Sequence, residues 1–194
     1  LDDFLARLGE LARISQAYGS SLVDLQGVTG ELNRQFGLSG EASVEATYAI
    51  MNAAQAGSME ASDFSQNFAQ AMGQYSMSRG GRGRGQAAVM DFAAAAQVIA
   101  SGGVGGEQAR TQMQNLMNQL SDRKVQRRLR RAGVEVLDEN GMMRSFSDIA
   151  RQGAASADLR DPTKLRTILP EAWAARALTT LISREGTDKS VSAI

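Results

Sequence analysis

Residues 86–120, QAAVMDFAAAAQVIASGGVGGEQARTQMQNLMNQL, decide the fold. Apolar residues recur every three or four positions from Gln86 to about Ala100 and again from Glu107 to Leu120, which is the spacing of one helical face. Between them, SGGVGG is four-sixths glycine, a composition typical of a turn. The stretch therefore predicts a helical hairpin, and it places the chain in the all-α class.

The same period extends outward in both directions. Only two prolines occur in the chain, so long stretches are free to be helical. RGGRGRG (residues 79–85) interrupts the pattern, because a segment with four glycines in seven residues does not sustain a helix. Further helices are predicted over residues 1–18, 20–36, 39–57, 58–75, 122–132, 145–150 and 171–183, and Asp161-Pro162 marks another helix start.

One segment carries a strand signal. Val134–Leu137 alternates in part, Asp138–Gly141 is typical of a turn, and Met142–Arg144 continues beyond it. The sequence therefore predicts one small β-hairpin near residues 134–144 in an otherwise helical chain.

Composition excludes several classes of function. The 194 residues contain no Cys and no His, which rules out a disulfide framework, a Cys-rich zinc site, a thiol nucleophile and a Ser-His-Asp triad. We expect no enzyme, no metal and no cofactor. The most apolar stretch, Ala87–Ala100, is interrupted by Asp91 and Gln97 and is shorter than the roughly 20 residues that span a bilayer. It predicts a buried helix, and no membrane span is expected in this segment.

The formal net charge of zero conceals a polarity along the chain. Residues 1–63 hold 3 basic and 9 acidic groups, residues 64–134 hold 10 and 3, and residues 135–194 hold 8 and 9. The candidates for contact with a polyanion or a partner lie in RGGRGRG and in the basic stretch before residue 132: Arg79, Arg82, Arg84, Arg123, Lys124, Arg127, Arg128, Arg130 and Arg131.

Three interpretations of these cations stay open. They form a solvated face that pairs with the acidic N-terminal third, they contact nucleic acid with RGGRGRG as a flexible arm, or they meet an acidic partner subunit. No aromatic residue lies within either basic segment, which argues against base stacking. Trp173, the single Trp, is a candidate interface anchor.

Several segments resemble phage tail tape measure proteins. GLSGEASVEATYAIMNAAQAGSMEASDFSQNFAQAM (residues 37–72) is similar to the small-residue helical hairpins of that family. AGVEVLDENGMMRSFSDIARQ (132–152) is similar to its strand, turn and short-helix segment, and PEAWAARALTTLI (170–182) to its closing helix. The likeness covers about residues 37–183, and RGGRGRG and the Arg-rich stretch are the two departures from it.

The resemblance implies a structural virion protein rather than an enzyme. Such a segment would help to set tail length during assembly and take part in genome ejection. Its expected partners are tail-tube and tip or baseplate subunits and further copies of itself, in the tail lumen or tip, with the host cytoplasm as the place of assembly. DNA contact is a further possibility, and the alternative function is a nucleic-acid-binding helical module that uses residues 79–131.

The expected organisation has three parts. Amphipathic helices occupy residues 1–36, a tape-measure-like helical domain with the β-hairpin covers 37–183, and a flexible tail takes up 184–194. We also expect the chain to be a segment of a longer protein, since it begins with Leu1 and shows no signal peptide.

Overall fold

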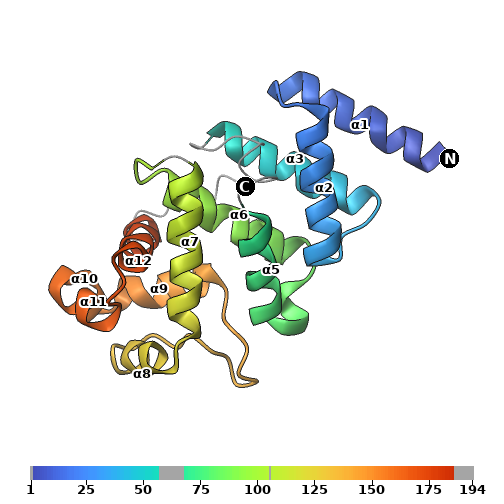
Figure 1. The fold of residues 1–194 in the computed structure, drawn as a ribbon. Helices are drawn as coiled ribbons and strands as arrows, with labels where there is room; N and C mark the ends of the chain where they lie inside the picture. The colour runs from blue at the N-terminus through green and yellow to red at the C-terminus, as the bar shows by residue number, and fades with distance from the viewer. Residues whose placement is uncertain (1, 57–67, 105, 186–194) are drawn as a thin grey trace.

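Helix α6 (Gln86–Ala100) lies at the centre of a helical arrangement in the computed structural model (Figure 1). The structure describes residues 2–56, 68–104 and 106–185, and within these ranges it contains helices and no strand. The all-α class is therefore confirmed. Around α6 the elements are α1 (Asp2–Tyr18), α2 (Leu22–Phe36), α3 (Glu41–Ala56), α5 (Ala69–Ser78), the 3₁₀ helix η1 (Gly80–Gly83), α7 (Gly106–Ser121), α8 (Arg123–Arg131), α9 (Phe146–Ala155), α10 (Ala157–Arg160), α11 (Pro162–Ile168) and α12 (Ala172–Glu185).

The predicted hairpin of α6 and α7 forms the middle of the core. Val89, Phe92, Ala96 and Ile99 are buried, as their spacing predicts, and the rest of α6 contributes mostly alanine. Because alanine side chains are small, neighbouring helices approach α6 from several sides. It contacts α2, α3 and α5 toward the N-terminal end of the molecule, and α7, α9 and α12 toward the C-terminal end.

Local signals set most helix ends. The Ser21 and Ser145 side chains accept backbone N–H bonds at the starts of α2 and α9, and Asp161 does the same for α11, which begins with Pro162. Gly37 ends α2 in the left-handed conformation, which glycine adopts without strain. Helix α3 begins at Glu41 rather than directly after Ser39.

The predicted β-hairpin at residues 134–144 is wrong. Leu137 and Met143 form one isolated antiparallel bridge, and no strand extends from it. The Asp138 side chain accepts the N–H groups of Asn140 and Met142, so the predicted turn is present. Two bonds cross the turn, from the N–H of Asp138 to the Met142 carbonyl and from the N–H of Arg144 to the Val136 carbonyl. Three other N–H groups bond elsewhere: that of Val134 to Leu129 in α8, that of Glu135 to the Gln152 side chain, and that of Met143 to Ser78 in α5. A longer ladder does not form because these three donors are used by the surrounding helices.

Residues from Leu11 to Ile182 share one hydrophobic core. The predicted helix over residues 58–75 lies partly outside the described residues, but its later part is α5, in which Met72 and Tyr75 are buried. Of the predicted tail 184–194, Arg184 and Glu185 belong to α12, and residues 186–194 lie outside the described residues. In the described part of the chain, no helix is both long enough and apolar enough to cross a bilayer.

Candidate partner interfaces

The first predicted basic segment, RGGRGRG, is tied to the core. Its glycines form the single 3₁₀ turn η1, and the Gly85 N–H bonds to the Phe36 carbonyl at the end of α2 (2.9 Å). Gly83 lies so close to α5 that a β-carbon there would sit 2.1 Å from the Ser76 carbonyl oxygen. The segment is thus fixed against α2 and α5 instead of forming the flexible arm expected of it.

The three arginines of this segment have different surroundings. Arg79 ends α5 with only 14% of its side chain exposed, and it forms an ion pair with Asp91 (3.4 Å). Arg82 lies in η1, and its side chain falls outside the described residues. Arg84 is exposed just after η1. Arg79 is therefore part of the interior and is not presented to a partner.

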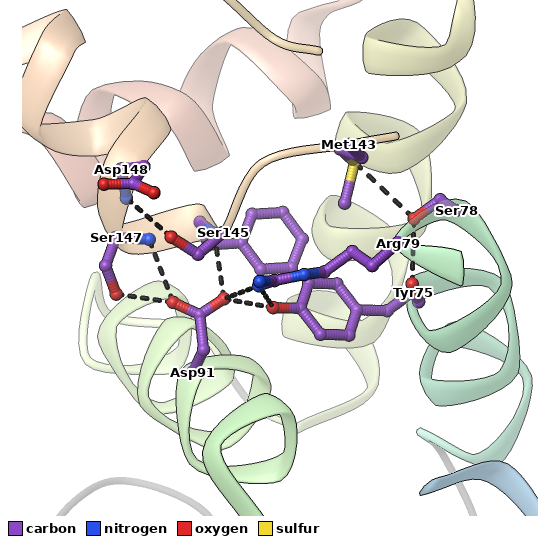
Figure 2. Close-up of polar contacts among 9 residues, drawn as sticks. Tyr75, Ser78, Arg79, Asp91, Met143, Ser145, Ser147 and Asp148 are labelled. Atoms are coloured by element: carbon purple, nitrogen blue, oxygen red, sulfur yellow. Dashed lines mark hydrogen bonds and ion pairs between the residues drawn. The ribbon is translucent and has the colours of Figure 1, made fainter. Parts of the chain in front are cut away.

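Asp91 collects the polar contacts of this interior site, which we call the Asp91 junction (Figure 2). Its carboxylate accepts bonds from the Tyr75 hydroxyl in α5 and from the backbone N–H groups of Phe146 (2.9 Å) and Ser147 (3.0 Å) at the start of α9. The positive end of the α9 dipole and the Arg79 guanidinium both face this carboxylate. The junction thereby joins α5, α6 and α9.

Burial raises the pKa of Tyr75 well above its ordinary value, and the negative charge of Asp91 raises it further. Arg79 donates to the Tyr75 hydroxyl, and its guanidinium lies 5.3 Å from the Tyr75 ring centre. The ring in turn stacks on Phe146. The Tyr75 hydroxyl, the Arg79 guanidinium and the Asp91 carboxylate thus contact one another, which makes the junction a structural joint between helices.

The second predicted basic segment is helix α8, and its six cations all lie on the surface. Asp122 begins the helix by accepting the N–H groups of Lys124 and Val125, and these bonds lower the pKa of Asp122. Val125 and Leu129 are buried and hold the helix on the core. The exposed side chains are Arg123, Lys124, Arg127, Arg128, Arg130 and Arg131.

Few of these cations are engaged. Arg130 pairs with Glu135 (3.1 Å) on the surface, and Arg128 donates to the Thr167 carbonyl in α11 (3.1 Å). Helix α8 packs against α7 and α11, at the end of the molecule opposite α1–α3 (Figure 1). The interpretation that α8 pairs with the acidic N-terminal third is therefore wrong within one molecule, because the two regions are far apart.

Trp173 lies at the edge of a groove between α10, α11 and α12. The groove has a volume of about 800 Å³, and 37% of the Trp173 surface is exposed. Apolar side chains such as Leu159, Leu165 and Ile182 face it together with three exposed arginines, Arg160, Arg166 and Arg176. We call this site the arginine groove.

The acidic residues near the arginine groove are occupied. Asp158 accepts from Lys164 (2.7 Å), which raises the pKa of Lys164. Asp161 and Glu171 accept backbone N–H bonds at the starts of α11 and α12. Within the described residues none of the three groove arginines has an ion-pair partner. The groove thus combines an apolar interior with unneutralised positive charge, which suits an acidic protein surface.

Sequence reasoning identified Trp173 but missed the three arginines around it and the role of Asp91. The arginines are separate in the sequence, and only the packing of α10–α12 brings them together. One feature of the sequence could have marked Asp91, because it is a single carboxylate within an Ala-rich stretch. Its partners at the start of α9 could not be found in this way, because they are 55 residues away.

Among the described residues, no group of three Asp or Glu side chains is placed to hold a metal ion. The two exposed sites are suited to binding a partner. One is a helix with six cations, and the other is an apolar groove bordered by arginine. Comparison with protein-family models, with curated proteins and with solved structures finds no match for this chain.

Proposed function

We propose that this chain is a compact helical segment of a phage tail tape measure protein, which helps to set tail length during assembly and takes part in genome ejection. The family likeness of residues 37–183 supports the proposal, and so does a fold built from short packed helices. In this proposal the segment works in the tail lumen or tip, after assembly in the host cytoplasm.

The likeness of residues 37–183 carries the proposal, and helix α8 is the surface that we propose for contact with a partner. It holds six exposed cations on nine residues, fixed to the core by Val125 and Leu129. It has no exposed apolar residue of its own, so it suits a partner that offers charge rather than a pocket. An acidic surface of a tail-tube or tip subunit is such a partner, and long-range attraction would guide the encounter.

The folded shape determines which part of a ruler this segment would form. One continuous helix of 194 residues would extend to about 290 Å at about 1.5 Å per residue. The chain instead folds back on itself around α6 (Figure 1). We therefore propose a compact terminal part of the ruler, which contacts other tail subunits, and not the extended rod.

Charge reversal on α8 tests the proposal. The variant carries Arg127→Glu and Arg131→Glu, two exposed residues on one helical face. The matched control carries Arg34→Glu and Arg151→Glu, two exposed residues on α2 and α9 that change the net charge equally. Binding to purified tail-tube and tip subunits is measured by calorimetry. We expect the wild type and the control to bind, and the α8 variant to bind at least about tenfold more weakly.

A second candidate function is a nucleic-acid-binding module, and the same exposed cations favour it. Of its predicted segment 79–131, Arg79 is internal, so α8 would provide most of the contact. Binding of a short DNA duplex at low salt, with an affinity that falls steeply as salt rises and is lost in the α8 variant, would establish this candidate. Such a result, together with no binding to tail subunits, would refute the tape measure proposal.

A further inference from the structure

Two surfaces at opposite ends of the molecule are complementary in charge. The arginine groove, between α10, α11 and α12, lies at one end. At the other end α1 and α3 border a hollow of about 400 Å³ that contains three exposed glutamates and Tyr48. We call Glu10, Glu41, Glu45 and Tyr48 the acidic face.

The acidic face has the same construction as the arginine groove with the opposite sign. Tyr48 is 52% exposed, and Ile14 and Val44 line the apolar part of the hollow. Arg13 is the single cation beside the three glutamates, and none of the glutamates has an ion pair with a described residue. Each surface thus presents one exposed aromatic ring, an apolar hollow and three charges of one sign.

We propose that the acidic face of one copy binds the arginine groove of the next copy, head to tail. Three glutamates opposite three arginines give charge complementarity, and Tyr48 and Trp173 provide the large apolar contacts that interfaces favour. A single molecule does not bring its own two surfaces together, because they lie at its opposite ends (Figure 1). The complementary surface therefore belongs to another copy.

Helix α8 is less suited to this contact. Its exposed side chains are all polar or charged, whereas both hollows expose apolar surface that gains free energy on burial. It lies beside the arginine groove through its contact with α11, so its charge adds to the attraction of an acidic surface. It remains available for a different partner.

This contact is heterologous, because the two copies use different surfaces. Every added copy leaves one acidic face and one arginine groove free, and growth continues until a ring closes. The inference is independent of the proposed function: a chain that binds tail subunits but stays monomeric would refute only the head-to-tail contact.

Two variants remove one surface each. Glu45→Arg places a cation on the acidic face, where it repels the groove arginines, and Trp173→Ala removes the aromatic ring of the groove. The matched controls are Glu139→Arg, an exposed acid outside both surfaces, and Met142→Ala, a large apolar residue that is 40% exposed, close to the 37% of Trp173. Far-UV circular dichroism verifies that each variant is folded.

Sedimentation velocity then measures mass as a function of protein concentration. We expect the mass of the wild type and both controls to rise with concentration at low salt and to fall when salt is added. Each surface variant should associate at least about tenfold more weakly. An equal mixture of the two variants should form a 1:1 dimer and nothing larger, because only one intact face and one intact groove remain.

Three results would overturn the proposal. The first is a wild-type chain that is monomeric at every concentration, which would leave the groove to another partner. The second is association that Trp173→Ala abolishes and Glu45→Arg does not affect, which would indicate two grooves facing each other. The third is a mixture of the two variants that stays monomeric.

Discussion

Asp91 carries the most contacts of any polar side chain in the described interior. It lies on an Ala-rich helix with 9% of its side chain exposed, in surroundings that disfavour a lone charge. The charge is stable there because Arg79, the Tyr75 hydroxyl and the first turn of α9 surround it. A single carboxylate thus replaces the capping that water would otherwise give to the N-terminus of α9.

Replacing that carboxylate should destabilise the protein strongly. Asp91→Asn leaves the mostly buried Arg79 without its counter-charge, and we expect the free energy of unfolding to fall by about 3 kcal/mol. Urea denaturation measures the change. Glu135→Gln breaks the exposed pair with Arg130 and should cost less than about 0.5 kcal/mol. An equal decrease in the free energy of unfolding of the two variants would show that the Asp91 junction stabilises the fold no more than an exposed ion pair does.

Tyr75 should make stability depend on alkaline pH. Its folded pKa is raised by burial and by Asp91, above the unfolded value of about 10. The neutral hydroxyl is therefore favoured in the folded state, and its contribution is fully present below about pH 10. As pH rises above 10, toward the folded pKa, unfolding should become easier by up to about 1.4 kcal/mol per pH unit.

Unfolding at several pH values with Tyr75→Phe measures this dependence. In Tyr75→Phe the free energy of unfolding should fall less steeply above pH 10 than in the wild type. Tyr18→Phe changes a more accessible tyrosine, and its free energy of unfolding should fall as steeply as that of the wild type. An unchanged slope in Tyr75→Phe would contradict the assignment.

At the scale of elements, η1 packs tightly against the backbone of α5. A β-carbon at Gly83 would meet the Ser76 carbonyl oxygen at 2.1 Å, and backbone does not move aside as a flexible side chain does. We expect Gly83→Ala to lower the free energy of unfolding by about 2 kcal/mol or more. Gly30 in α2 has no atom within 4 Å of such a carbon, so Gly30→Ala should instead stabilise the helix by about 0.5–1 kcal/mol. Thermal denaturation of both variants measures the two changes in stability. If both variants were stabilised, or both destabilised, the steric argument would be refuted.

Helices were predictable where the signal is local. The periodicity of residues 86–120 and the helix starts at Ser145 and Asp161 each depend on neighbours within a few residues, and the structure confirms them. The hairpin near 134–144 was not predictable in this way. Its turn is local, but the N–H of Met143 bonds to Ser78, 65 residues earlier, and a sequence pattern contains no information on that competition.

The candidate interfaces follow the same division. The basic run of α8 is contiguous in the sequence, so the exposed cations were identified correctly, whereas their distance from the acidic N-terminal third depends on the whole fold. The arginine groove draws its residues from α9, α10, α11 and α12, and only Trp173 was noticed, because it is the single Trp.

At the scale of the molecule, α12 connects the C-terminal elements to the centre. It packs against α6, α7 and α9, and α6 in turn contacts α2 and α3. Because one hydrophobic core includes all of these helices, we expect a single cooperative unfolding transition. Trp173 fluorescence reports on the groove end and far-UV circular dichroism on all helices, so their urea midpoints should coincide.

Leu178→Ala, at a fully buried position of α12, should lower both midpoints together, with a loss of about 3 kcal/mol. Two separate midpoints would show that the N-terminal helices unfold independently of the C-terminal elements.

The Asp91 junction has a mechanical consequence. Its bond to Phe146 joins positions 55 residues apart, so the intervening chain is enclosed by a non-covalent clasp. A pull applied to the two ends of the chain would load this clasp together with the packing of α7 against α6 and α12. When it breaks, the freed residues can extend to about 190 Å at about 3.4 Å each. One carboxylate is therefore among the contacts that keep this stretch folded under tension.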